Sequence, residues 1–285
     1  MIFAMLFKHM SKILFMMKIN NWLQISKSQL EASGNTSSRL DCLILLELIL
    51  KKDRSVILAH LEDELTQEQQ AELKVLLTRR IQHEPIAYIR GYSEFYGRNF
   101  FVSPMVLIPR PESEDIITIL KSLDLPKKPN IADVGTGSGA LAVSASIELP
   151  LATVDAYDIS ESALHIARKN ATSLGAVVHF TKQDLLSRPL ALYDVVIANL
   201  PYVSAEQTIS PDTKHEPAIA LFSDDDGLAH INRLFTQLND TVVAKDGYLL
   251  IEAEPRQHER IISDGLNHGF KITKIEGFIL LFQKS

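Results

Sequence analysis

Apolar residues in the first third of the chain recur at helical spacing. Leu43, Leu46 and Leu50 lie three or four positions apart, which predicts a buried helix. A capping box at Thr66–Gln69 predicts the start of another helix, which ends at the Glu-Pro dipeptide that follows it, because the residue before a proline disfavours helical geometry. We therefore expect a small helical domain over residues 1–85.

The pattern changes between residues 88 and 107. Aromatic and β-branched residues there surround Gly91 and Gly97, a composition typical of a β-hairpin or of two short strands. We expect residues 86–108 to form a hairpin connector between the helical domain and the remainder of the chain.

Apolar strand patterns alternate with helical patterns in the last part of the chain. The expected strands are Ile131–Val134, Ala152–Tyr157, Tyr193–Ala198 and Tyr248–Ile251. Helices are expected at 140–147 and between the capping residue Ser160 and the stop at Gly175. This alternation predicts an α/β domain over residues 109–285 with a doubly wound, mostly parallel sheet. Ligands then bind at the carboxyl ends of the strands.

Composition narrows the classes of function. The net charge of −6 gives no broad positive field, so we expect no stable binding to nucleic acid. The single cysteine, Cys42, cannot form an intrachain disulfide, which favours the reducing cytoplasm. None of the nine histidines pairs with a cysteine or histidine at metal-ligand spacing, so no metal site is expected.

The amino terminus is apolar, but it does not have the pattern of a membrane anchor. Lys8 and Lys12 interrupt it and Lys18 closes it, short of the ~20 apolar residues that span a bilayer. It also lacks the pattern of a cleaved signal peptide. We expect residues 1–16 to be an extension before a start at Met17, and no association with a membrane.

A glycine-rich segment follows the first strand of the α/β domain and precedes a helix. It reads Asp133-Val134-Gly135-Thr136-Gly137-Ser138-Gly139. Glycines let the backbone turn tightly and approach a ligand at the helix amino terminus. The spacing also satisfies the dinucleotide-binding pattern. Asp133 favours the ammonium group of a methionine moiety over a pyrophosphate, because it carries a negative charge.

Two further aspartates occupy positions that suit a nucleoside. Asp158 ends the second strand, where a carboxylate accepts hydrogen bonds from both ribose hydroxyls, as in NAD and S-adenosylmethionine sites. Asp184 follows the next strand and is expected to accept the adenine amino group, while Leu185 covers the ring. Taken alone, Asp158 is also compatible with a solvated aspartate before a helix.

The tetrapeptide Asn199-Leu200-Pro201-Tyr202 ends the third strand. The Asn199 side-chain oxygen and the Leu200 carbonyl are expected to accept the two N–H groups of one planar NH2. Pro201 stiffens the turn, and Tyr202 stacks on the planar target. Such positioning favours methylation of an amide or amino nitrogen, with the cofactor carrying the reactive methyl group.

These motifs resemble the class I amino methyltransferases. Four further segments are similar to one branch, the protein-(glutamine-N5) methyltransferases of peptide-chain release factors (the HemK/PrmC family). The segments are Glu84–Ile89, Gly91–Gly97, Pro109–Glu114 and Glu216-Pro217. The third reads Pro-Arg-Pro-Glu-Ser-Glu, where the family has Pro-Arg-Pro-Glu-Thr-Glu. The similarity extends from Arg39 to Glu254.

The resemblance implies a seven-stranded methyltransferase sheet that binds S-adenosyl-L-methionine. The implied cofactor residues are Asp133, Gly135–Gly139, Asp158, Asp184, Leu185 and Asn199. Residues 199–202 would hold the glutamine of the Gly-Gly-Gln loop of a release factor, and the helical domain would dock that partner. Leu200 stands where the family has proline, but a main-chain carbonyl suffices there, so we expect activity to survive. The loop before the last strand is shorter than in the family.

Several alternatives remain at this point. Methylation of an exocyclic amine in DNA or ribosomal RNA is the nearest, followed by an inactive cofactor-binding module and an NAD oxidoreductase. We expect a monomeric enzyme. Glu252 and Glu254 are interpreted as residues of a strand end beside a loop, and Arg79 and Arg80 as part of a solvated helix face.

Overall fold

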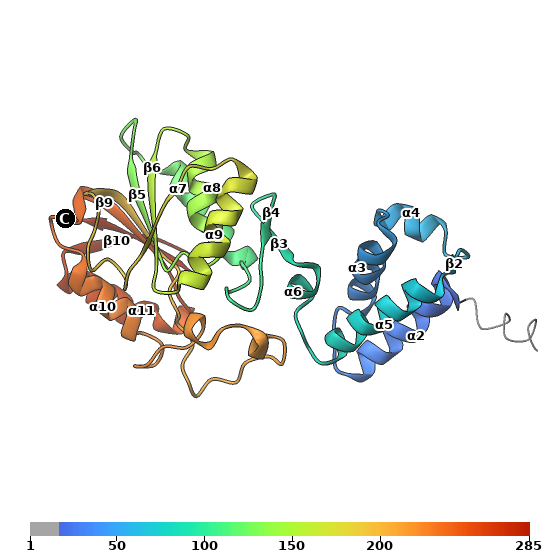
Figure 1. The fold of residues 1–285 in the computed structure, drawn as a ribbon. Coiled ribbons are helices and arrows are strands. Elements are labelled where there is room, and N and C mark those ends of the chain that lie inside the picture. The colour runs from blue at the N-terminus through green and yellow to red at the C-terminus, as the bar shows by residue number, and fades with distance from the viewer. Residues whose placement is uncertain (1–16) are drawn as a thin grey trace, which may run out of the picture. The chain divides into compact units, whose positions relative to one another are not determined.

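The computed structural model describes residues 17–285, so the expectation for residues 1–16 lies outside it. The chain divides after Arg90 into two compact units (Figure 1). Among the described residues, none of the helices has both the length and the apolar character that a membrane crossing requires.

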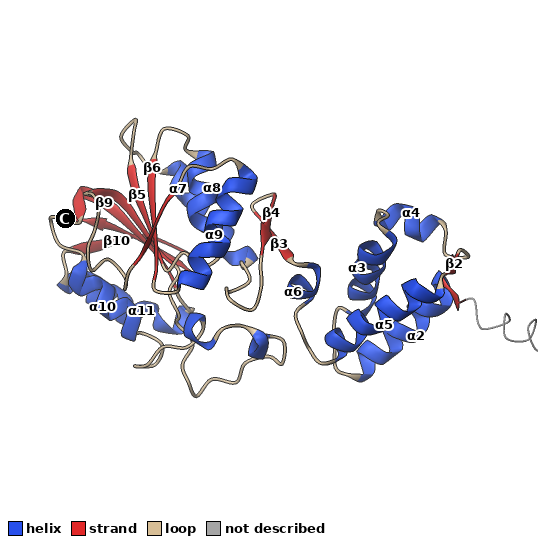
Figure 2. Cartoon of the chain, in the orientation of Figure 1, coloured by secondary structure: helices blue, strands red, loops and turns tan. Residues whose placement is uncertain are grey.

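The first unit is helical (Figure 2). Its elements are β1 (Met17–Lys18), α2 (Ile19–Ala32), α3 (Ser38–Leu50), α4 (Arg54–Ala59), β2 (Glu64–Leu65), α5 (Gln67–Ile81) and α6 (Ile86–Arg90). The predicted capping box is present, because Thr66 and Gln69 each accept a hydrogen bond from the backbone N–H of the other. Trp22 lies in a core of leucine and isoleucine side chains from α2, α3 and α5.

One ion pair in this unit corrects the interpretation of the sequence. Arg80 is not on a solvated face: its Nε donates to Asp41 Oδ2 at 2.6 Å, and the two side chains are 5% and 2% exposed. Arg79 is more exposed, and it pairs with Glu84. Helical periodicity could not separate the two arginines, because Asp41 lies on α3, 39 residues away.

The second unit is the expected α/β sheet. It begins with the hairpin β3 (Tyr92–Phe95) and β4 (Arg98–Phe101) and continues through η1 (Pro111–Ser113), α7 (Glu114–Ser122), β5 (Asn130–Val134), α8 (Ala140–Glu148), β6 (Thr153–Asp158), α9 (Glu161–Leu174), β7 (His179–Lys182), β8 (Tyr193–Ala198), η2 (Thr213–His215), η3 (Ala218–Ala220), α10 (Ala229–Gln237), β9 (Val243–Glu252), η4 (Pro255–Gln257), α11 (His258–Asn267), β10 (Phe270–Glu276) and β11 (Ile279–Lys284).

Seven strands form one sheet in the order β10-β11-β9-β8-β5-β6-β7. The pairs from β9 to β7 are parallel, whereas β11 is antiparallel to both of its neighbours. This confirms the predicted fold class. The shortened last loop is accommodated by a tight turn, since Glu276 pairs with Ile279 and Gly277 adopts a positive φ of 56°.

Helices cover both faces of the sheet (Figures 1 and 2). One core packs apolar side chains of α7 and α8 against the strands, and the other packs those of α10 and α11 against the opposite face. The central strands β5 and β8 are buried on both faces, which explains their nearly continuous apolar sequences.

The hairpin begins at Tyr92 and not at residue 88. The Pro85 carbonyl accepts hydrogen bonds from Tyr88 and Ile89, and residues 86–90 form a helical turn instead. The hairpin packs on the sheet unit through Asn170 of α9. Its side-chain oxygen accepts a hydrogen bond from the Phe101 N–H, and its NH2 group donates to the Phe101 carbonyl. The NH2 group also donates to the carbonyl of Ser138, at 2.8 Å.

Candidate active site

A large cleft opens at the carboxyl ends of β5 and β8. The chain runs from β5 outward through β6 and β7 and then returns to β8 on the other side, so the loops after β5 and β8 diverge. The cleft opens between these diverging loops, where ligands bind in sheets of this kind. Its lining includes Gly135, Gly137, Asp158, Asp184, Leu185, Asn199, Leu200 and Pro201. The structure therefore brings together residues from four of the predicted motifs.

The glycine loop turns from β5 into α8 with a backbone that other residues rarely adopt. The Gly135 and Thr136 amides both donate to the carbonyl of Tyr157, and φ is 75° at Gly135 and 81° at Gly139. A Cβ at Gly139 would lie 3.0 Å from the Ala167 Cβ. Thr136 and Ser138 are buried. The glycines thus permit both the turn and the close packing of α8 against α9.

Asp133 lies beneath this loop and is 1% exposed. Its Oδ2 accepts hydrogen bonds from Thr136 Oγ1 at 2.6 Å and from the Ala142 N–H at 3.1 Å. Burial raises the pKa of Asp133 to about 6, and these two hydrogen bonds act in the opposite direction. The carboxyl group therefore fastens the loop to the first turn of α8. Contact with a cofactor ammonium stays a prediction.

Asp158 lies across the cleft from β8, at the end of β6. Its Oδ2 accepts the Gly137 N–H and its Oδ1 accepts the Ser160 N–H, both at 2.8 Å. Burial raises the pKa of Asp158 above its usual range. Each carboxylate oxygen can accept a further hydrogen bond, and contact with two ribose hydroxyls stays a prediction.

Replacing Asp158 by Ala is expected to weaken cofactor binding by about 10- to 100-fold, the loss expected from hydrogen bonds to a charged group. Wild-type affinity should be constant at neutral pH and decline as the pH falls through the raised pKa, because protonation removes the charged acceptor. Titration calorimetry with S-adenosylhomocysteine across a pH series measures both effects. Equal affinity of wild type and variant would contradict this assignment.

Asp184 and Leu185 lie on the far wall of the cleft. Leu185 is buried and has a positive φ of 50°, a strained conformation for a leucine, held in part by a hydrogen bond from the Gln183 side chain to its carbonyl. Asp184 forms an ion pair with Arg233 of α10. The sequence did not indicate this arginine, which also lines the cleft.

The tetrapeptide after β8 borders two cavities. Asn199, Leu200 and Pro201 line the large cleft and also a second cavity, which Tyr202 lines as well. The Leu200 side chain is buried, and its Cδ2 would lie 2.9 Å from a Cβ on Gly135. The leucine thus packs directly against the glycine loop.

Contacts from other segments hold this tetrapeptide. Asn199 Nδ2 donates to Ser113 Oγ at 3.0 Å, and the Tyr202 hydroxyl donates to Glu252 Oε1 at 3.2 Å. Ser113 itself donates to Glu252 Oε2 at 2.6 Å. The Pro109–Glu114 segment, the end of β8 and the end of β9 therefore meet at one point.

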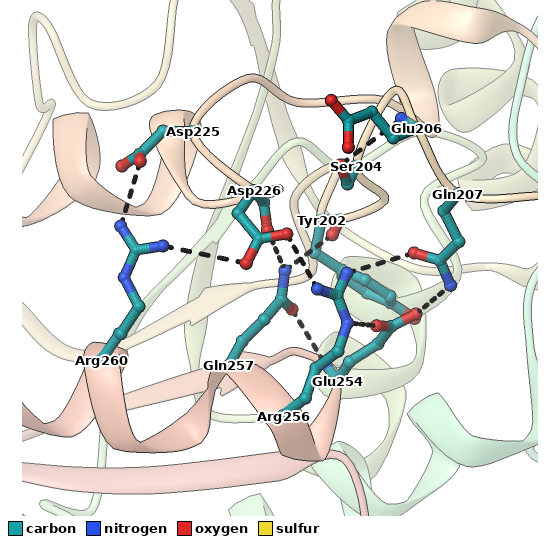
Figure 3. Close-up of polar contacts among 10 residues, drawn as sticks. All are labelled: Tyr202, Ser204, Glu206, Gln207, Asp225, Asp226, Glu254, Arg256, Gln257 and Arg260. Atoms are coloured by element: carbon teal, nitrogen blue, oxygen red, sulfur yellow. Dashed lines mark hydrogen bonds and ion pairs between the residues drawn. The ribbon is translucent and has the colours of Figure 1, made fainter.

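The loop that follows Tyr202 is anchored by residues after β9 (Figure 3). Gln257 Nε2 donates to the carbonyls of Tyr202, at 2.9 Å, and Asp226, at 2.8 Å. Arg256 bridges Glu254, Asp226 and the Gln207 side chain. These contacts fix both ends of the loop beside the second cavity.

A second anchor joins two sequence motifs. Glu216 is buried and accepts hydrogen bonds from the Ile108 N–H at 3.0 Å and from Arg110 Nη2 at 2.5 Å. The Glu216-Pro217 and Pro109–Glu114 segments are therefore in contact beside the second cavity, whose lining includes Arg110.

Comparison with known proteins identifies the family. Residues 21–91 match the PrmC N-terminal domain, and residues 116–216 match the methyltransferase small domain. The release factor glutamine methyltransferase of Coxiella burnetii is 38% identical over 83% of this chain and 86% of that protein. The chain belongs to the release factor glutamine methyltransferase family.

Further members of this methyltransferase family show similar agreement. Identity is 41% with the Koribacter versatilis protein, over 73% of this chain and 77% of that protein. It is 36% with the Escherichia coli K12 protein, over 86% of this chain and 89% of that protein. A solved methyltransferase from Pyrococcus furiosus shares the fold, with a TM-score of 0.52, 18% identity and coverage of 77% of this chain and all of that one.

Glu252 ends β9, as the sequence predicted, but the sequence did not indicate that it belongs to the site. It is 1% exposed and accepts hydrogen bonds from both Ser113 and Tyr202, which come from distant segments. Its position was a signal: it ends a parallel strand, as Asp158 does. Glu254 is different, because it contacts Arg256 and Gln207 and lines the second cavity.

Proposed function

We propose that the protein transfers a methyl group from S-adenosylmethionine to the side-chain amide nitrogen of the glutamine in the Gly-Gly-Gln loop of a peptide-chain release factor. The observation that carries the proposal is that Asn199, Leu200 and Pro201 line both the large cleft and the second cavity. Group transfer between two ligands requires that their binding sites adjoin, and residues that line both cavities show that these two cavities do. The names of the relatives described above supply the class of substrate.

The residues of the large cleft fit S-adenosylmethionine. The glycine backbone at Gly135 and Gly137 admits the methionine portion, the Asp158 carboxylate suits the ribose hydroxyls, and the apolar Leu185 suits the adenine ring. Asp133, Thr136 and Ser138 support the loop. When bound, the cofactor supplies an electrophilic methyl group.

The second cavity is proposed to hold the glutamine side chain. An amide nitrogen is a poor nucleophile, because its lone pair is delocalised into the carbonyl. Asn199 Oδ1 and the Leu200 carbonyl each accept one N–H of the same amide, which holds the nitrogen in line with the methyl group. Tyr202 packs against the planar amide. Positioning of this kind lowers a barrier by about 7 kcal/mol when the geometry is ideal.

The remaining assignments concern the partner and the place of action. We assign docking of the release factor to the helical unit, because this is the role that the family resemblance implies. We also propose that the protein acts as a monomer in the cytoplasm, where release factors meet the ribosome, and that it holds no nucleic acid stably, given its net charge of −6.

Methyl-labelled S-adenosylmethionine tests the class of acceptor. The protein is incubated with an intact release factor, with the same factor carrying Ala in place of its loop glutamine, and with ribosomal RNA and DNA. Label is expected only in the intact factor. Label in nucleic acid would overturn the proposed substrate, and cofactor binding without any transfer would identify an inactive module.

The Leu200→Pro variant tests whether only the backbone of this position is used. We expect the transfer rate to change by less than about threefold, or ~0.7 kcal/mol of barrier, because proline also supplies a carbonyl. Single-turnover transfer at saturating cofactor measures this. A loss of a hundredfold with an unchanged melting temperature would mean that the Leu200 side chain takes part.

A further inference from the structure

A buried chain of hydrogen bonds links the end of β9 to Asn199. Glu252 accepts the Ser113 hydroxyl at 2.6 Å, and Ser113 Oγ in turn accepts the Asn199 Nδ2 group at 3.0 Å. Glu252 and Ser113 are 1% and 3% exposed, and they lie 139 residues apart in sequence. Water does not compete for the buried contact between Glu252 and Ser113, so each of these two groups determines the partner of the other.

The direction of these bonds follows from the donors and acceptors available. An ionised carboxylate can only accept, so the Ser113 hydroxyl donates its single proton to Glu252. The Ser113 oxygen can then only accept from Asn199, and this selects the Nδ2 end of the amide. Asn199 Oδ1 is consequently left to face away from Ser113.

We propose that Glu252, acting through Ser113, is a positioning residue that fixes which end of the Asn199 amide meets the substrate. This inference rests on the proposed function, since the orientation matters only if Asn199 Oδ1 accepts an N–H of the substrate amide. With the amide reversed, Nδ2 would face the substrate NH2, and two donors would oppose each other.

The same segment also fixes Tyr202. Glu252 Oε1 accepts the Tyr202 hydroxyl, and Gln257 donates to the Tyr202 carbonyl. The two ends of the tyrosine are therefore held by residues five positions apart, at the end of β9 and in η4. A substituted Glu252 disturbs Asn199 and Tyr202 together.

The charge state of Glu252 determines the direction of these hydrogen bonds. Burial raises the pKa of Glu252 above its usual range, while hydrogen bonds from Ser113, Tyr202 and, to a smaller extent, Asn199 lower it. The other ionisable group that acts on it is Glu112, which also raises its pKa. Once protonated, Glu252 becomes a donor to one hydroxyl and removes the constraint on the Asn199 amide.

The test compares two substitutions in the full-length protein. In Glu252→Gln, either orientation of the new amide turns one of the two acceptor contacts into a donor contact. In Ser113→Ala, the link itself is lost. Each is expected to lower kcat by roughly 10- to 100-fold, with the cofactor Kd changed less than about twofold. Ser113→Thr keeps the hydroxyl and should recover most of the loss. Thr118→Ala removes an exposed hydroxyl from α7 and serves as the control.

A pH profile separates positioning from a structural role. Wild-type kcat should decline on the acidic side as Glu252 takes up a proton, and that decline should be absent in Glu252→Gln. An unchanged kcat in both substitutions, or an identical acidic limb, would overturn the inference while leaving the proposed function intact. Wild-type protein that methylates no release factor would instead overturn the proposed function. Melting temperatures and cofactor Kd identify any variant that has not folded.

Discussion

Replacing Asn199 by Ala is expected to reduce methyl transfer on the order of 10³-fold, because the proposed function uses its side-chain oxygen to accept an N–H of the substrate amide. Asn199 borders both cavities, but most of the large cleft is lined by other segments, among them the glycine loop and the loops after β6 and β7. Cofactor affinity should therefore change less than about threefold, or ~0.7 kcal/mol. Single-turnover transfer and calorimetry with S-adenosylhomocysteine give the two values.

A matched control is available on the same sheet. Asn130 is at the amino end of β5, where its side chain donates to the Leu192 carbonyl. Asn130→Ala should leave transfer unchanged. Parallel losses of transfer and cofactor affinity in Asn199→Ala would mean that Asn199 acts on the cofactor and not on the acceptor.

Replacing Arg80 by Ala is expected to lower the free energy of unfolding of the helical unit by roughly 3–5 kcal/mol, because it leaves the buried Asp41 carboxylate without its partner. Trp22 is the only tryptophan in the chain, and it lies in the core of this unit. Its fluorescence during urea unfolding therefore reports on this unit separately from the sheet.

Arg79→Ala provides the comparison for this prediction. Arg79 is the neighbouring residue on the same helix, but its ion pair with Glu84 is partly exposed, so its loss should cost only about 0–1 kcal/mol. Equal effects of the two substitutions would show that burial does not set the strength of the Arg80–Asp41 pair.

Local sequence patterns were sufficient to predict the fold class and the end of the sheet at which the site lies. Continuous apolar runs identified the four longest parallel strands, and the rule that ligands bind at strand ends placed Asp158 and Asn199 on one cleft. The hairpin was predicted with the wrong start. Backbone hydrogen bonds to Pro85 form a helical turn there, despite aromatic and β-branched residues.

What the sequence could not supply are the partners of polar side chains. Arg80 has the same helical context as Arg79, and only the packing of α3 against α5 makes it buried. The local sequence around Glu252 resembles that of an exposed strand end, and only its contacts with Ser113 and Tyr202, from distant segments, distinguish it. The Arg233 that pairs with Asp184 likewise comes from another helix. Such contacts depend on tertiary structure, which periodicity does not encode.

The most direct test of the account is to locate the methyl group. A release factor is incubated with the protein and S-adenosylmethionine, digested, and sequenced by tandem mass spectrometry. We expect one added methyl group on the glutamine side chain of the Gly-Gly-Gln peptide, and no such group when the Asn199→Ala variant is used. A methyl group on any other residue, or an unmodified factor beside methylated nucleic acid, would contradict it.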